Sequence, residues 1–357
     1  MPDGLGDVER LLLGSEPGLT RREVADRADV PVEVAEELWR RLGFPATADD
    51  DVAFVEADVE ALRLARELTE MGVLDPDSQA ALVRTWGRSF ARLAEWQTAL
   101  LARVATAGSD GGVPASSDAD PMARLTALTD EVLPRVETLQ SYVWRRHLAS
   151  ATARRLAQGS RDGGTATRLA VGFVDIVGYT ATSRNLDESA LVAWVEGFED
   201  TATTVVVDHG GRVIKNIGDE VLYVADDPAA AAEIALALVE RGAGDDDFPG
   251  VRAGVSYGEV VARLGDVFGE TVNLAARLTS AARPGTVLVE SGVHDLLCGD
   301  HDEGGDRDGA DVEADGAGHA GGRDDPPYDL RRVRRASVKN YPGLRVWALR
   351  RPATRRR

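Results

Sequence analysis

The sequence predicts two regions of different fold class: an all-α first half, and an α+β second half built on a ferredoxin-like antiparallel sheet with its helices on one face. Residues 1–157 carry helix-start signals and apolar stripes at helical spacing, which predict a helical domain. Residues 167–357 carry short apolar runs that alternate with helical segments, in the order expected for that sheet. Residues 158–166, rich in Gly, Ser and Thr, are predicted to be a linker.

Length, charge and cysteine content narrow the class of protein. A chain of 357 residues suits two domains, and its net charge of −19 argues against general affinity for nucleic acid. The single cysteine, Cys298, excludes an internal disulfide and fits a reducing compartment. No basic and apolar leader opens the chain, and the longest apolar segment, near Ala229–Val239, is too short to span a bilayer. We therefore expect a soluble, cytoplasmic protein without a membrane span.

A pair of short helices is predicted near the start of the chain. Thr20-Arg-Arg-Glu23 is a capping box that opens the first, and Pro31 and Gly43 bound the second over Val32–Leu42. Such a helix-turn-helix could read DNA. The second helix, however, carries three acidic side chains: Glu33, Glu36 and Glu37. Because these would face phosphates badly, a small helical packing unit is the better interpretation of residues 19–44.

Three longer helices are predicted next, near Asp58–Met71, Pro76–Thr106 and Pro121–Ala157. The middle one carries an apolar stripe at helical spacing that includes Trp86 and Trp96. Such a stripe is typical of a core or a dimer interface. An apolar ligand groove between helices is the alternative.

The second half alternates strands and helices. The first helix is predicted at about Glu188–Val207, and the second begins after Pro228 and ends near Gly242. Two strands, Val251–Tyr257 and Glu259–Leu264, are predicted to pair around Gly258. Residues 300–327 are rich in Asp and Gly and predict a disordered acidic insertion, because they have too few apolar side chains to order themselves.

The second half is organised around Val171–Thr180, an apolar strand that ends in Asp175 and is followed by a glycine turn. A carboxylate at this point cannot be buried unpaired, so Asp175 needs a metal, a basic partner or solvent. Gly178 lets the backbone turn tightly, so that main-chain N–H groups after Asp175 could face a phosphate, and Thr180 adds a hydroxyl. The plainer alternative is a strand that ends in a helix-capping aspartate.

A second acid strengthens the interpretation of Asp175 as a ligand. Residues 212–224 predict two short strands joined by a Gly218-Asp219 turn. If this hairpin lies beside the first strand, Asp219 and Asp175 project at one end of the sheet and form a site for a hard divalent cation. Further along, Asn273 and Arg277 lie four residues apart on a predicted helix and share one face.

Together, these residues resemble the catalytic domain of class III nucleotidyl cyclases, over about residues 165–292 with a final strand near 343–349. The resemblance implies two Mg²⁺ or Mn²⁺ ions per active site. It assigns these metal ions to Asp175, Asp219 and the main-chain carbonyl of Ile176.

The same resemblance implies that ATP is converted to cyclic AMP and pyrophosphate. Lys215 and Asp266 would read the adenine ring, because a lysine donor and an aspartate acceptor complement N1 and N6 of adenine and oppose guanine. Asn273 and Arg277 would stabilise the transition state. Arg252 would hold the terminal phosphates. The turn after Asp175 would cradle them, through Gly178, Tyr179 and Thr180.

The resemblance further implies a homodimer, because one chain supplies the metal aspartates and its partner supplies the base-reading and transition-state residues. The first half resembles, more loosely, the regulatory domain of actinobacterial adenylate cyclases, including pH-responsive ones. That likeness implies an autoinhibitory, dimer-forming role, with sensing of pH, a lipid or another small-molecule effector left open. His147 is the one histidine in residues 1–157 and so the candidate for a pH input; the plainer alternative is a solvent-exposed histidine just ahead of the linker.

Three rival functions remain open from the sequence. A guanylate cyclase is opposed by Lys215 and Asp266. A catalytically silent nucleotide-binding regulator is opposed by the intact metal and transition-state residues. A DNA-binding regulator would use residues 19–44 and is opposed by the acidic composition.

Overall fold

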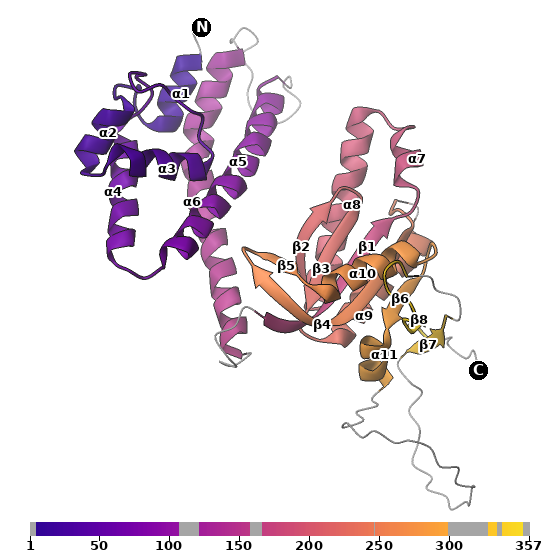
Figure 1. Ribbon diagram of the computed structural model, residues 1–357. Coiled ribbons are helices and arrows are strands. Elements are labelled where there is room, and N and C mark those ends of the chain that lie inside the picture. Colours follow the sequence, from indigo (N-terminus) through magenta and orange to yellow (C-terminus); the bar gives the residue numbers. More distant parts are fainter. Residues whose placement is uncertain are drawn as a thin grey trace, which may run out of the picture. The chain divides into compact units, whose positions relative to one another are not determined.

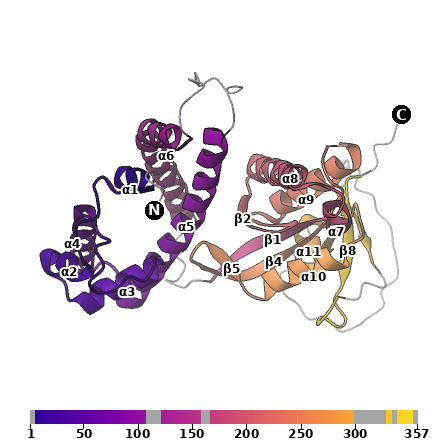
Figure 2. The ribbon, with the colours of Figure 1, turned by 90° about the horizontal axis from the view of Figure 1, so that it is seen from above.

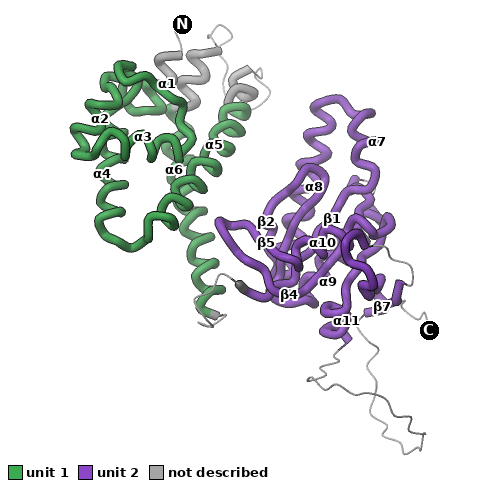
Figure 3. The backbone as a smooth tube through the Cα atoms, in the orientation of Figure 1, with its two compact units in different colours: residues 1–161 green, residues 162–357 purple. Residues whose placement is uncertain are grey.

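The computed structural model describes residues 5–106, 121–157, 166–245, 247–298, 328–333 and 338–352. The chain forms two compact units, residues 1–161 and 162–357, which are coloured separately in Figure 3. The predicted linker, apart from Ala166, and the predicted acidic insertion at 300–327 lie outside the described residues. Among the described residues, no helix is both long enough and apolar enough to cross a bilayer.

The first unit is helical, as predicted. Its helices are α1 (Leu5–Leu13), α2 (Arg21–Ala28), α3 (Val32–Leu42), α4 (Glu56–Glu70), α5 (Pro76–Thr106) and α6 (Pro121–Ala157). The capping box at Thr20 forms, because the Thr20 N–H donates to Glu23 Oε2 at 2.8 Å and the Thr20 hydroxyl accepts from the Glu23 N–H. A small core of α2, α3 and α4 closes around Trp39, whose ring lies 4.7 Å from that of Phe54.

The apolar stripe of α5 does not enter this core. The side chains of Trp86 and Trp96 are 40% and 54% exposed, and Phe90 is 58% exposed. Smaller residues at the start of the helix, such as Ala81 and Val83, are the ones that are buried. The predicted stripe, which begins at Ala81, is therefore buried only at its start, and the dimer-interface and ligand-groove roles of its exposed part stay predictions.

The second unit is built on one sheet. Its strands are β1 (Ala166–Ile176), β2 (Arg212–Ile217), β3 (Glu220–Ala225), β4 (Val251–Arg263), β5 (Asp266–Phe268), β6 (Val287–Glu290), β7 (Asp329–Arg332) and β8 (Val346–Arg350). They are ordered β2-β3-β1-β4-β6-β8-β7, with β5 paired to β4 (Figure 1). The helices are α7 (Tyr179–Ser183), α8 (Glu188–Asp208), α9 (Pro228–Gly244), α10 (Glu270–Ala281) and α11 (Ser291–Cys298).

Two details differ from the predicted strand pairing. Residues 251–263 form one continuous strand, β4, and do not fold back at Gly258; the outer half of β4 pairs with β5 instead. In addition, β4 and β6 run parallel, whereas every other pair is antiparallel. The connection between β4 and β6 passes through helix α10, which returns the chain to the starting edge of the sheet and so allows the parallel pairing.

Helices cover both faces of this sheet, whereas the sequence predicted one covered face. α8 and α9 lie on one side and α10 on the other, as Figure 2 shows. The reason is visible in β1, where Ala170 and Val174 join the core under α8 and α9, and Val171 and Phe173 join the core that contains Ala275 of α10. An unbroken apolar run of this kind is typical of a strand buried on both sides.

A glycine sets how closely α10 approaches the sheet. A Cβ at Gly254 of β4 would lie 2.4 Å from the main-chain nitrogen of Thr279 and 2.7 Å from the carbonyl oxygen of Ala275. Only a residue without a side chain therefore lets the α10 backbone rest directly on β4. The Thr279 hydroxyl adds a hydrogen bond to the carbonyl oxygen of Phe173 on β1, at 3.3 Å.

Candidate active site

Asp175 and Arg252 form an ion pair at the end of the central strands. They are directly opposite each other in the β1–β4 register, so the pairing of the two strands alone brings them together. Arg252 donates from Nε and Nη2 to Asp175 Oδ2, at 2.7 and 2.5 Å. A third Arg252 nitrogen donates to the carbonyl oxygen of Ser280 at 3.3 Å, which ties the pair to the end of α10. Asp175 is only 14% exposed, so this pair is partly shielded from water.

Two more acids approach Asp175 from the β2–β3 hairpin. Gly218 turns the chain with φ 66°, and Asp219 then accepts, through its main-chain oxygen, a hydrogen bond from the Ile176 N–H at 3.0 Å. Glu220, the next residue, lies opposite Asp175 in the β1–β3 register. Asp175, Asp219 and Glu220 together are called the carboxylate cluster below.

The carboxylate cluster holds more negative charge than Arg252 neutralises. Burial raises the pKa of Asp175; the hydrogen bond from Arg252 opposes this rise and the charge of Asp219 adds to it. Burial, together with the charges of Asp175 and Asp219, raises the pKa of Glu220 to about 7. The sequence analysis missed Glu220. The only signal for it was its place beside Asp219 at the start of a strand.

The carboxylate cluster fits a divalent cation with few protein ligands. Its excess negative charge would be relieved by a bound cation. Within the described ranges, no group of three or more His, Cys, Asp and Glu side chains is placed to hold a metal ion, so no closed protein cage exists here. Mg²⁺ suits such a site, since it is commonly bound by one or two carboxylates and takes its other oxygens from water and substrate phosphates.

Lys215 and Asp266 form a second ion pair, between β2 and β5. Lys215 Nζ lies 2.5 Å from Asp266 Oδ2, and the other Asp266 oxygen accepts from the Val267 N–H at 2.8 Å. Both side chains remain accessible, at 41% and 27% exposed. Lys215 and Asp266 are 51 positions apart in the sequence, and the structure brings them together. The sequence analysis had assigned both to reading the adenine ring.

Asn273 and Arg277 lie on the outer face of α10. Both are exposed, whereas Thr271, Ala275 and Leu278 form the buried face of that helix. In the part of the chain that the structure describes, no hydrogen bond or ion pair joins the side chains of Asn273 and Arg277 to the carboxylate cluster or to Lys215. The structure therefore places these two residues on one accessible face, and it does not bring them into contact with the other candidates.

The turn after β1 has the backbone that the sequence predicted. Gly178 adopts a left-handed conformation with φ 76°, and its carbonyl oxygen accepts from the Ala181 and Thr182 N–H groups. Thr180 is exposed. The Tyr179 ring stacks on that of Trp194 with centroids 5.8 Å apart, so the ring packs beside α8.

Comparison with known proteins matches both halves of the chain. Residues 164–322 match the adenylate and guanylate cyclase catalytic domain, and residues 2–136 match the adenylate cyclase regulatory domain. An adenylate cyclase from Glutamicibacter nicotianae is 40% identical over 303 residues, which cover 81% of this chain and 74% of that protein. An adenylate cyclase from Streptomyces coelicolor is 42% identical over 284 residues, which cover 80% of this chain and 73% of that protein.

A pH-sensitive adenylate cyclase from Mycobacterium tuberculosis is 31% identical over 292 residues, covering 78% of this chain and 70% of that protein. Among solved structures, the adenylyl cyclase CyaB from P. aeruginosa is 19% identical, covers 53% of this chain and 96% of that chain, and has a TM-score of 0.40. That score is too low to add to the sequence similarity.

Proposed function

The chain belongs to the adenylate cyclases that join a regulatory domain to a class III catalytic domain, and on this premise we propose how its residues convert ATP to cyclic AMP and pyrophosphate. The observation that carries the proposal is the carboxylate cluster at the end of β1, where Asp175 is paired with Arg252 and lies close to Asp219. Acidic ligands and a guanidinium at one point suit a phosphoryl reaction. The catalytic unit would span residues 167–357, and residues 1–157 the regulatory unit.

Asp175 and Asp219, with the main-chain carbonyl of Ile176, are the proposed ligands of two Mg²⁺ or Mn²⁺ ions. When bound, such ions lower the pKa of the attacking ribose hydroxyl and neutralise charge on the leaving pyrophosphate. Arg252 is the proposed ligand of the terminal phosphates. It holds Asp175 by two charge-assisted hydrogen bonds, and phosphate oxygens accept the same bonds from a guanidinium. The main-chain N–H groups of Gly178 and Tyr179 and the exposed Thr180 would support the same phosphates.

Lys215 and Asp266 are proposed to select adenine. Their ion pair is accessible to solvent, so opening it toward a base costs no more than about 1 kcal/mol. Lys215 would then donate to N1 of adenine and Asp266 would accept from N6. Guanine presents a donor and an acceptor at those positions, which would leave both protein groups facing like partners.

Asn273 and Arg277 are proposed to orient the ribose and to stabilise charge on the α-phosphate from a second copy of the chain. Their exposure on α10 supports this, because a residue that acts across an interface must reach beyond its own subunit. Large apolar side chains are also exposed on the β2, β4 and β5 segments around Asp266: Ile217, Val261, Leu264 and Phe268. Such a patch suits a homodimer with two equivalent sites.

The helical unit is proposed to regulate this dimer. Any input that rotates one catalytic unit against the other would separate the two halves of each site. His147, exposed on α6, stays the candidate for a pH input, and a lipid or another small molecule is the alternative effector. Replacement of His147 by alanine should flatten a pH response, and an unchanged profile would remove it from the proposal. The proposed location of the enzyme is the cytoplasm.

The test is cyclic AMP production by the purified full chain. ATP and Mn²⁺ should give product, and either excess EDTA or Asp175→Asn should reduce it to background. Ser189→Ala, at an exposed position of α8, is a control that should leave the rate unchanged. If ATP binds but no cyclic AMP forms at any pH tested, the silent nucleotide-binding regulator becomes the better account.

A further inference from the structure

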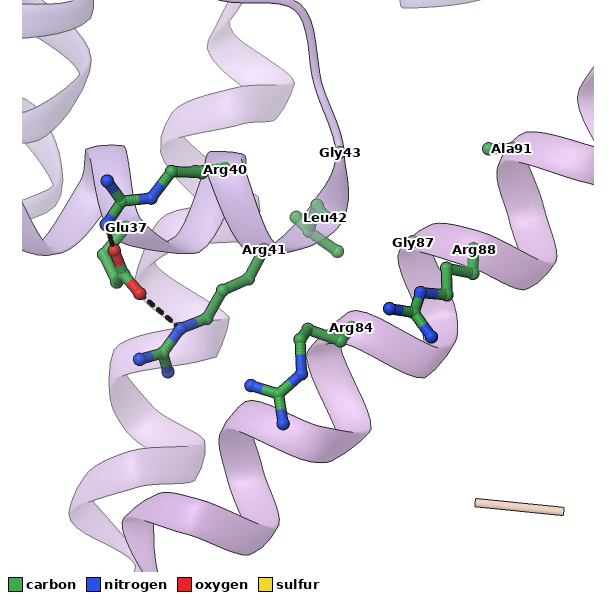
Figure 4. A pocket seen from close by; sticks show the side chains of 9 residues that line it. All are labelled: Glu37, Arg40, Arg41, Leu42, Gly43, Arg84, Gly87, Arg88 and Ala91. Carbon is green, nitrogen blue, oxygen red and sulfur yellow. Dashed lines mark hydrogen bonds and ion pairs between the residues drawn. The ribbon is translucent and has the colours of Figure 1, made fainter. Parts of the chain in front are cut away.

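We propose that the helical unit contains a binding site for a small anion that carries two or more phosphate charges. The site is a pocket of about 470 Å³ between the end of α3 and the middle of α5 (Figure 4). It is lined by Glu37, Arg40, Arg41, Leu42, Gly43, Arg84, Gly87, Arg88 and Ala91 and is called the arginine pocket below. The inference concerns binding alone and does not rest on the proposed cyclase chemistry.

A close contact between the two helices builds the arginine pocket. A Cβ at Gly87 of α5 would lie 2.2 Å from the carbonyl oxygen of Leu42, so only glycine lets the last turn of α3 rest against α5. Gly43 then turns the chain away with φ 81°. Figure 4 shows Arg84 and Arg88 extending from α5 on the side where Arg41 descends from α3.

Two of the four arginines are held by polar contacts with described residues of the helical unit, and the other two are not. Arg40 and Arg41 lie in the last turn of α3, where cations complement the helix dipole, and both pair with Glu37; the Arg41 Nε–Glu37 Oε1 distance is 2.6 Å. Arg84 and Arg88 form no hydrogen bond or ion pair with any residue that the structure describes. They are also four apart on one helix, where like charges destabilise each other.

The charge of the arginine pocket is unusual for this chain. Four guanidinium groups face one carboxylate, in a protein whose net charge is −19. No acid lies three or four residues from Arg84 or Arg88 on α5, so the sequence itself supplies no local counter-charge. A bound anion would supply the missing charge and remove the repulsion between them.

Phosphate is the chemistry that this lining fits. Guanidinium groups are donors only, and their planar fork matches two phosphate oxygens at once. Four arginines can therefore serve more than one phosphate group. The volume lies within the usual range for small-molecule sites, about 300–1,000 Å³. A soluble polyphosphate and a phospholipid headgroup share this chemistry.

The test is calorimetric titration of the full chain with inorganic tripolyphosphate in EDTA. The double variant Arg84→Gln/Arg88→Gln should lose one site per chain, or bind there about 100-fold more weakly, at about tenfold for each charge-assisted contact. Arg145→Gln/Arg146→Gln, at two exposed positions of α6, makes the same change in net charge and should bind like the wild type. Any phosphate binding by the catalytic unit is common to all three proteins, so the difference between them isolates the arginine pocket.

Glu37→Gln gives a test of opposite sign. It removes the one acid of the pocket and frees Arg40 and Arg41, so tripolyphosphate should bind several-fold more tightly. Damage to the fold would weaken binding instead. A second arm replaces tripolyphosphate by phosphatidylcholine vesicles that contain phosphatidic acid. The proposal is supported if the wild type binds in one of the two arms and Arg84→Gln/Arg88→Gln abolishes that binding. The arm in which this happens shows whether the ligand is a soluble polyphosphate or a phospholipid headgroup. Equal binding by that variant and the Arg145/Arg146 control in both arms would overturn it.

Discussion

Gly254→Ala should destabilise the catalytic unit and lower its activity by more than the loss of folded protein explains. The added Cβ would lie 2.4 Å from the Thr279 nitrogen and 2.7 Å from the Ala275 carbonyl oxygen. Ordinary contacts of a carbon atom are about 3.5–4.0 Å, so α10 must move outward by roughly 1 Å. Both clashing atoms are backbone atoms of that helix, and no side-chain rotation relieves them. Overpacking of this kind costs about 1–3 kcal/mol of unfolding free energy.

The same displacement of α10 should also lower the rate of the reaction. Asn273 and Arg277 lie on this helix, and a misplacement of about 1 Å in a catalytic group lowers a rate by roughly 100-fold. The assay is cyclic AMP formation at a temperature where urea titration shows the variant to be fully folded. The fall should lie mainly in kcat, because the base-reading pair, Lys215 and Asp266, is carried by β2 and β5.

Gly197→Ala is the matched control. Gly197 lies within α8, and a Cβ there meets nothing within 4 Å. The same substitution should therefore stabilise the protein by about 0.5–1 kcal/mol, since alanine is the better helix former, and should leave kcat unchanged. The reasoning would be refuted if both variants shifted the urea midpoint in the same direction, or if Gly254→Ala kept full activity. Either result would mean that the close packing of α10 on β4 does not position Asn273 and Arg277.

Three further predictions concern single side chains. Because the pKa of Glu220 is raised from 4.5 to about 7, the stability that Glu220 itself contributes to the metal-free protein should be full below pH 4.5 and should be lost as the pH rises toward 7. The loss in unfolding free energy should be about 1–2 kcal/mol after allowance for solvent screening. The urea midpoints of the wild type and Glu220→Gln should therefore diverge between pH 4.5 and 7, and parallel pH profiles would refute the raised pKa of Glu220. Lys215→Ala should raise KM for ATP about tenfold and reduce the preference for ATP over GTP, measured by steady-state kinetics with both nucleotides. An unchanged ratio of kcat/KM for ATP to kcat/KM for GTP would exclude Lys215 from base selection. Tyr223→Phe removes a buried hydrogen bond from the hydroxyl to the Ala231 carbonyl oxygen and should cost about 1–2 kcal/mol in urea unfolding without altering kcat, whereas a neutral result would mean that this oxygen finds another donor.

The sequence by itself determined the local structure and the chemical character of this protein. The capping box at Thr20, the hairpin turn at Gly218 and the left-handed turn at Gly178 each form where nearby residue types require them. The apolar run before Asp175 forms a strand for the same reason. These features depend on interactions within a few residues, which a sequence displays directly.

The tertiary structure alone decided which distant residues meet and how deeply they are buried. Arg252 reaches Asp175 across 77 positions because β1 pairs with β4 in one register. The raised pKa of Glu220 follows from burial beside two other acids, and the arginine pocket exists because α3 can touch α5 at Gly87. Desolvation and charge–charge energies depend on distance in space, and sequence separation does not give that distance.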